Sequence, residues 1–230
     1  MTFDALLREA QADPDVVGVA LGGSRGKGAH VTERSDHDLW VVVRNEEALR
    51  RWVELHPSRH GDPIEVLLAT LDAFRRHGPD YAFAHVTPLL DRGGFAALLA
   101  EKGRVDPGSA EEPLDGYVNL LYRAAKNARD GRRLEARLDA AESVPYLLEF
   151  LFRSFGRVRP YNKWLRWELE HHPLEPPWTA EALPPRLERV LAGELSEQHA
   201  LFRDAERLAR GRGLGDVIDG WEADSSLLRG

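Results

Sequence analysis

The sequence predicts an α+β protein, in which a small mixed sheet with helices is followed by an all-helical second half. Short apolar runs bounded by turn residues, as at 16–21 and 39–43, indicate strands. Apolar residues at helical spacing occupy the stretches between these runs. After about Gly103 only the helical pattern continues, which separates the two halves.

The first half alternates strands and helices in order. Apolar residues of 3–12 have helical spacing, and the helix over 46–55 is expected to stop before Pro57. Thr70 is expected to cap the helix that follows it. The expected helices are 3–12, one turn near 24–27, 46–55, 71–76 and 95–102, and the expected strands are 16–21, 39–43, 64–68 and 82–90.

A cluster of turn-forming residues marks a domain boundary. Asp106-Pro107-Gly108 and Glu112-Pro113 predict a hinge between domains 1–106 and 107–230. Ser143 is expected to begin a new helix, with Pro145 tolerated in its first turn. The tail from Gly220 is expected to be loosely held. The expected helices of this half are 114–130, 134–141, 146–155, 164–171 and 187–210.

Composition limits the classes of function. The net charge of −7 argues against a nucleic-acid binder that works through bulk positive charge, although an acidic surface would suit a cationic substrate. The absence of cysteine excludes disulfides and thiolate metal sites. No signal sequence or apolar run of roughly 20 residues is present, so we expect a cytoplasmic protein without a membrane partner.

Two aspartates carry the chemistry expected of the chain. Asp36 and Asp38 stand at the start of a strand, where alternate side chains point the same way, so both face one side and His37 faces the other. Two adjacent negative charges repel each other unless a cation lies between them. Mg²⁺ is the usual partner because it prefers oxygen ligands and binds one or two carboxylates together with substrate phosphates.

A glycine-rich turn precedes these aspartates. Leu21-Gly22-Gly23-Ser24-Arg25-Gly26 follows the first strand, and its glycines allow the backbone to come close to a ligand. Backbone N–H groups around Gly23 and the Ser24 hydroxyl could therefore bind phosphate oxygens. Arg25 could contact a phosphate as well, or could be a charge that simply faces solvent.

This combination resembles the nucleotidyltransferase superfamily typified by polymerase beta and the antibiotic nucleotidyltransferases. The superfamily signature is Gly-Ser, a short spacer and Asp-x-Asp at a strand start, matched here by Gly23-Ser24 and Asp36-x-Asp38. The resemblance implies a polymerase-beta-like catalytic domain whose metal site is completed by an acidic residue on a later strand. Glu65 is in the matching place, and Asp62 is the alternative.

The helical half carries a second likeness. Its segment Arg157–Trp164, which contains Asn162-Lys163-Trp164, is similar to one found in a bacterial group of two-domain nucleotidyltransferase-like proteins. In the superfamily a basic residue of the helical domain reaches the triphosphate, which implies Lys163, or Lys126 as the second candidate. Such an ammonium group would stabilise the charge on leaving pyrophosphate. The alternative is that both lysines are ordinary surface charges.

The resemblance implies an enzyme that uses two Mg²⁺ ions, held by Asp36, Asp38 and Glu65, and a nucleoside triphosphate, expected to be ATP. It would transfer a nucleoside monophosphate to a hydroxyl of a small molecule, such as an aminoglycoside- or lincosamide-like antibiotic. The base could be Glu65 through the metal, or Glu149 or Glu142 directly. The alternatives are a protein-AMPylating antitoxin-type enzyme and a non-catalytic nucleotide-binding module. The sequence does not indicate an oligomeric state.

Overall fold

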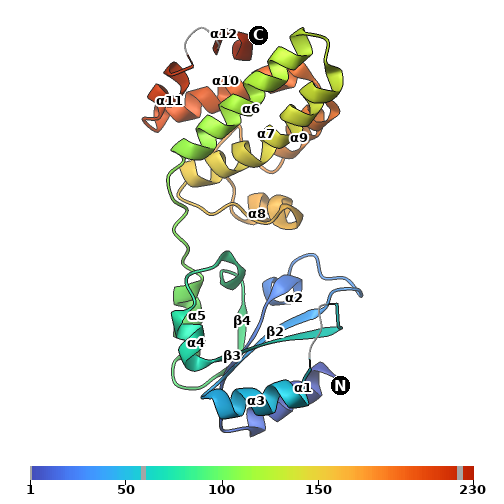
Figure 1. The fold of residues 1–230 in the computed structure, drawn as a ribbon, viewed down its shortest axis with the longest axis vertical. Helices are drawn as coiled ribbons and strands as arrows, with labels where there is room; N and C mark the ends of the chain where they lie inside the picture. The colour runs from blue at the N-terminus through green and yellow to red at the C-terminus, as the bar shows by residue number, and fades with distance from the viewer. Residues whose placement is uncertain (1, 58–60, 222–224) are drawn as a thin grey trace. The chain divides into compact units, whose positions relative to one another are not determined.

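The structure is a computed structural model that describes residues 2–57, 61–221 and 225–230. It divides into two compact units, Met1–Val105 and Asp106–Gly230 (Figure 1). The first unit combines a sheet with helices and the second is helical, which confirms the α+β class that the apolar patterns predict. No helix in the described ranges is both long and apolar enough to cross a membrane.

Within the described residues, the first unit contains one sheet of four strands in the order β3-β2-β1-β4. β1 pairs antiparallel with β2 and β4, whereas β2 and β3 are parallel. The strands are β1 (Val16–Leu21), β2 (His37–Val43), β3 (Ile64–Thr70) and β4 (Thr87–Asp91). The helices are α1 (Phe3–Ala12), α2 (Gly23–Lys27), α3 (Glu46–Leu55), α4 (Leu71–Arg76), α5 (Phe95–Lys102) and the short 3₁₀ helix η1 (Tyr81–Phe83).

Helices cover both faces of this sheet because successive strand residues alternate between the faces. In β2, Leu39, Val41 and Val43 pack with α1 and α3, which lie side by side in Figure 1. Trp40 and Val42 pack instead with α4, η1 and α5 on the opposite face. Odd and even positions of β2 are therefore assigned to opposite faces, and Asp38 shares the face of Trp40.

The fourth strand is shorter than the predicted 82–90. Tyr81–Phe83 forms η1 instead, since the Asp80 side chain accepts a hydrogen bond from the Ala82 N–H (2.8 Å). The Phe83 ring is buried against Trp40. A local cap and aromatic packing therefore outweigh the alternation that predicted extended backbone. The predicted cap of α4 is confirmed, because Thr70 Oγ1 accepts from the Ala73 N–H (3.1 Å).

The second unit has a helical core built mainly from α6 and α7, whose apolar faces pack along each other. Aromatic side chains such as Tyr117, Phe150 and Trp178 fill its centre. The helices are α6 (Glu111–Arg129), α7 (Arg133–Ser154), α8 (Leu165–His171), α9 (Leu183–Ala192), α10 (Leu195–Gly211), α11 (Gly215–Asp219), α12 (Ser225–Arg229) and the 3₁₀ helix η2 (Asn162–Trp164).

The prediction of separate helices 134–141 and 146–155 is wrong, because α7 runs through Pro145 without a break. Ser143 is buried and its Oγ donates to the Ala140 carbonyl (2.7 Å) instead of capping a new helix. An interior proline costs about 3 kcal/mol. Each large apolar side chain buried on either side of it contributes about 1.5–3 kcal/mol, so tertiary packing overrides the local penalty.

The prediction of one helix over 187–210 is also wrong, because Gly193 adopts a left-handed conformation (φ +89°) and ends α9. The carboxyl-terminal tail is more firmly held than predicted. Trp221 Nε1 donates to Asp115 Oδ1 (3.2 Å), and Leu228 is fully buried. Residues 222–224 of that tail lie outside the described residues.

Candidate metal centre

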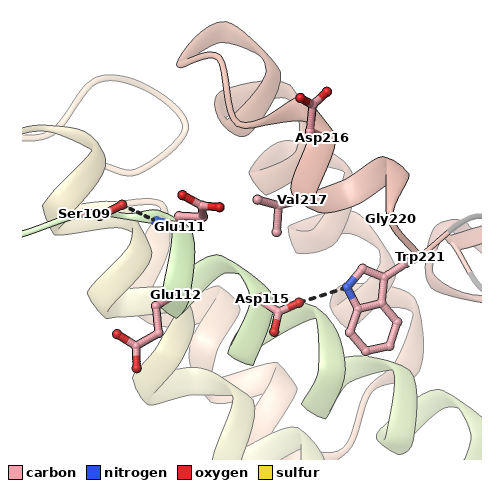
Figure 2. A pocket seen from close by; sticks show the side chains of 8 residues that line it. All are labelled: Ser109, Glu111, Glu112, Asp115, Asp216, Val217, Gly220 and Trp221. Carbon is pink, nitrogen blue, oxygen red and sulfur yellow. Dashed lines mark hydrogen bonds between the residues drawn. The ribbon is translucent and has the colours of Figure 1, made fainter.

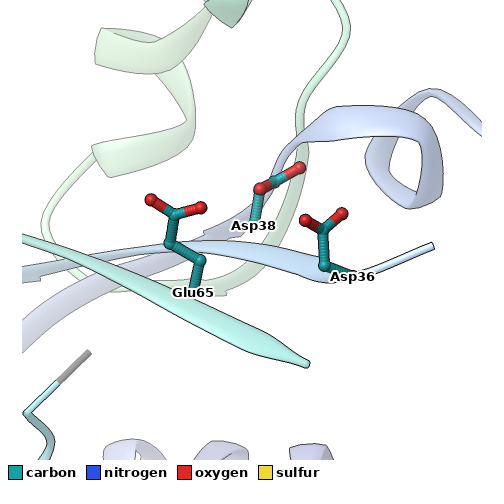
Figure 3. Close-up of side chains that lie close together, drawn as sticks. All are labelled: Asp36, Asp38 and Glu65. Carbon is teal, nitrogen blue, oxygen red and sulfur yellow. The ribbon is translucent and has the colours of Figure 1, made fainter. Parts of the chain in front are cut away.

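The three carboxylates predicted to act together share one face of the sheet. Asp38 and Glu65 are directly paired in the parallel register of β2 and β3, so both side chains project from the same side. Asp36 precedes Asp38 by two residues and follows the same alternation. Figure 3 shows the three carboxylates pointing toward one another from β3 and from the start of β2.

The geometry of this cluster fits a cation site. One carboxylate oxygen from each of Asp36, Asp38 and Glu65 lies within 4.8 Å of the other two. Asp36 is exposed, whereas Asp38 and Glu65 are half-buried. All the donors are carboxylate oxygens, which are the ligands of hard divalent cations. A cation placed among them would offset the mutual repulsion of three negative charges.

The glycine turn is fixed against β2 at Asp38. The Gly22 N–H donates to the Asp38 backbone carbonyl (2.7 Å). Gly23 has φ +59°, and a Cβ at this position would collide with Asp38 Oδ2. Gly23 is therefore required for the placement of the Asp38 carboxylate, a role that the sequence does not reveal because it depends on the contact between the turn and the strand.

Arg25 supports the loop that leads to Asp36. Its Nε–H lies within hydrogen-bonding distance of the backbone carbonyls of Ser35 (3.0 Å) and Asp36 (3.1 Å). The side chain is only partly exposed, so it is not the plain solvent-facing charge that was one reading of the sequence. Ser24 and Arg25 both belong to α2, beside the turn at Gly23.

Two neighbouring residues lie outside the cluster. His37 occupies the opposite face and stacks on Phe3 of α1, with ring centroids 4.7 Å apart. Asp62, the alternative third ligand, does not belong to the group of converging carboxylates found among the described residues. Glu65 therefore fits the position better than Asp62.

The other predicted site residues belong to the second unit. Lys126 Nζ lies 5.9 Å from the centre of the Tyr122 ring, and Lys163 Nζ lies 4.8 Å from that of Trp164. Glu149 accepts two hydrogen bonds from Arg153 (2.8 and 2.9 Å), which makes it an ion-pair partner, and Glu142 is exposed. The converging cluster itself is built from first-unit residues alone.

The second unit also holds a pocket of about 740 Å³ that sequence reasoning missed (Figure 2). Glu111, Glu112 and Asp115 of α6 line one side, and Asp216 of α11 and Trp221 line the other. Its lining is acidic, so its charge favours cations. The two sides are about 100 residues apart in sequence, and no local pattern connects them.

Comparisons with known proteins give little further information. No family model matches the chain, and no curated protein matches it. Among solved structures, the chain is similar to a nucleotidyltransferase-like protein from Exiguobacterium sibiricum 255-15, with 14% identity over 95% of this chain and 89% of that one and a TM-score of 0.37. A TM-score of this size does not establish a shared fold, so function has to be inferred from the residues of the site.

Proposed function

We propose that this chain is a Mg²⁺-dependent nucleotidyltransferase that moves a nucleoside monophosphate from a nucleoside triphosphate to a hydroxyl of a small molecule. The observation that carries the proposal is the convergence of Asp36, Asp38 and Glu65 next to the turn at Gly23-Ser24. The same residues form the signature by which the sequence resembles the superfamily. ATP is the nucleotide that we propose.

Asp36, Asp38 and Glu65 would hold the metal ions. Mg²⁺ bound there would polarise the α-phosphate and lower the pKa of the acceptor hydroxyl. β2 and β3 position Asp38 and Glu65, and Asp36 directly precedes β2. Rigid strands hold a catalytic constellation more accurately than loops do. Ser24 and Arg25, beside the cluster on α2, are the proposed contacts for the phosphates.

The reaction balances as a displacement at phosphorus. The acceptor oxygen forms a bond to the α-phosphorus, and the bond from that phosphorus to the bridging oxygen of the β-phosphate breaks. Pyrophosphate leaves with the electron pair. The acceptor proton passes to a carboxylate, for which Glu65 is our candidate.

The acceptor class is the finer part of this proposal. The acidic composition favours a cationic hydroxylated molecule of the aminoglycoside type, or a lincosamide-like one. Either would give the protein a role in antibiotic resistance. Transfer to a protein hydroxyl is the competing reaction, and it would appear as labelling of a polypeptide with the nucleotide.

The test is pyrophosphate release from ATP and Mg²⁺ with a panel of hydroxylated acceptors. Asp38→Asn should reduce the rate by at least about 10²–10³-fold, because it removes a charge from the group that binds the cation. Asp62→Asn is the matched control, since it removes a nearby carboxylate outside the cluster, and it should keep most of the rate. Circular dichroism should show that both variants fold. A folded Asp38→Asn variant with full activity would contradict the proposal.

A further inference from the structure

A second pocket in the helical unit has the opposite electrostatic character. It measures about 370 Å³ and lies where the α6–α7 and α9–α10 connections meet. That volume is within the range of small-molecule sites. Its walls are formed by small or apolar residues and by three polar side chains, namely Ala124, Ala128, Arg133, Ala136, Arg137, Ala192, Gly193, Leu195 and Gln198.

Arg133 and Arg137 give this pocket its charge. They lie four residues apart on the first turns of α7 and are therefore neighbours on one side of the helix. The Arg137 side chain lies over Gly193, since a Cβ there would be 3.0 Å from Arg137 Cγ. The lining contains no carboxylate. Two cationic groups thus border a single hollow.

Most other arginines of this unit are engaged with carboxylates. Arg153, Arg157 and Arg186, for example, form ion pairs of 2.6–2.8 Å with glutamate or aspartate. Neither Arg133 nor Arg137 forms an ion pair within the part of the chain that the structure describes. Their charges are therefore available to a ligand that carries negative charge.

Gln198 supplies a polar group between the walls. It is 4% exposed, and its Oε1 is buried without a hydrogen-bond donor among the described residues. The side chain also borders a narrow space lined by Tyr117 and Ser143. A half-turn of the amide exchanges its oxygen and nitrogen, so that it can accept a hydrogen bond from a ligand in the larger pocket.

We propose that this pocket binds a phosphate monoester of a small hydroxylated molecule. A phosphate monoester carries close to two negative charges at neutral pH, which matches two arginines better than a single carboxylate does. The alanine walls accept the carbon skeleton, and the amide of Gln198 accepts a hydrogen bond from a ligand hydroxyl. The site is independent of the proposed transfer reaction and consists of second-unit residues only.

The experiment is calorimetric titration of the full chain with ribose 5-phosphate, inorganic phosphate and ribose, in EDTA so that no divalent cation is present. Ribose 5-phosphate should bind the wild type more tightly than phosphate, and ribose should bind least. Arg133→Gln and Arg137→Gln should each weaken both phosphate-containing probes by about tenfold. Arg166→Gln is the matched control, because Arg166 is an exposed arginine outside the pocket, and it should leave both affinities unchanged.

The Gln198→Met variant distinguishes recognition of the ligand hydroxyl from recognition of the phosphate. It should weaken ribose 5-phosphate by about three- to tenfold and leave inorganic phosphate unchanged, since it replaces the amide by an apolar side chain and keeps both arginines. Asp38→Asn should bind all three probes like the wild type, which keeps this test apart from that of the proposed activity. Failure of the wild type to bind ribose 5-phosphate, or equal binding by Arg137→Gln and Arg166→Gln, would overturn the proposal.

Discussion

In the first unit, Asp36, Asp38 and Glu65 point toward one another, whereas in the second unit Glu197 and Asp204 point toward arginines. The first arrangement concentrates negative charge at the edge of a sheet. The second neutralises it, since Arg186 contacts both carboxylates at 2.6 Å. The residue types are the same, so the difference lies in what the fold places opposite each carboxylate.

In the second unit, arginines of that same unit lower the pKa values of two carboxyl groups. Burial alone would raise the pKa of Glu197, but hydrogen bonds from Arg186 and Arg189 outweigh it and hold that pKa below the usual value. For Glu206, the hydrogen bonds from Arg229 and Arg210 likewise lower the pKa. These carboxylates are paired with arginines, whereas a cluster of like charges is the arrangement that a cation site needs.

The largest expected effect is on the stability of the chain and concerns the ion pairs of the second unit. Arg186→Met should lower the free energy of unfolding by about 3 kcal/mol, because it removes two charge-assisted hydrogen bonds to mostly buried carboxylates, although Glu197 keeps its pair with Arg189 and Asp204 its pair with Arg207. Urea denaturation followed by tryptophan fluorescence measures it. Arg166→Met, at an exposed position, should change stability by less than about 0.5 kcal/mol. Similar values for the two variants would show that the ion pairs contribute little.

The next largest effect concerns the position of the Asp38 carboxylate in the cluster of the first unit. Gly23→Ala should reduce pyrophosphate release by about 10²-fold, because its Cβ would displace the Asp38 carboxylate. Gly28→Ala is the matched control, since Gly28 also has a positive φ (+68°) but a Cβ there meets nothing within 4 Å. Both variants carry the backbone strain, so only the collision distinguishes them. Equal activities would refute the assigned role of Gly23.

The smallest expected effect is a gain in stability in the first unit, opposite in sign to the loss expected for Arg186→Met in the second. In EDTA, Asp36→Asn should raise the stability of the chain by an amount on the order of 1 kcal/mol, because it relieves repulsion within the cluster. Differential scanning fluorimetry should show a higher Tm in EDTA and a smaller gain on adding Mg²⁺ than in the wild type. Asp91→Asn, at the exposed end of β4, should change neither value. A lower Tm for Asp36→Asn in EDTA would argue against a repulsive cluster.

Local patterns were sufficient for most elements of the first unit. Helices α1, α3, α4 and α5 have the predicted bounds, because each combines a cap or breaker with a clear helical stripe. The second unit was harder to predict. Long-range packing overrides the helix-breaking tendency of Pro145, whereas at Gly193 the local cap conformation of glycine ends a helix that the predicted range 187–210 had carried through it. The acidic pocket and the arginine-lined pocket of the second unit each join distant segments and have no sequence signature.

The sequence by itself determined which side chains of the first unit could meet a cation, because the period of two in a strand places Asp36 and Asp38 on one face. It also placed Glu65 on a later strand, but could not say that this strand lies beside β2, in parallel register and with Glu65 opposite Asp38. Only the tertiary structure decided that, and it brings Glu65, but not Asp62, into the group of converging carboxylates. The physical reason is that strand pairing depends on burying both faces of the sheet under helices from the whole unit, which no short stretch of sequence encodes.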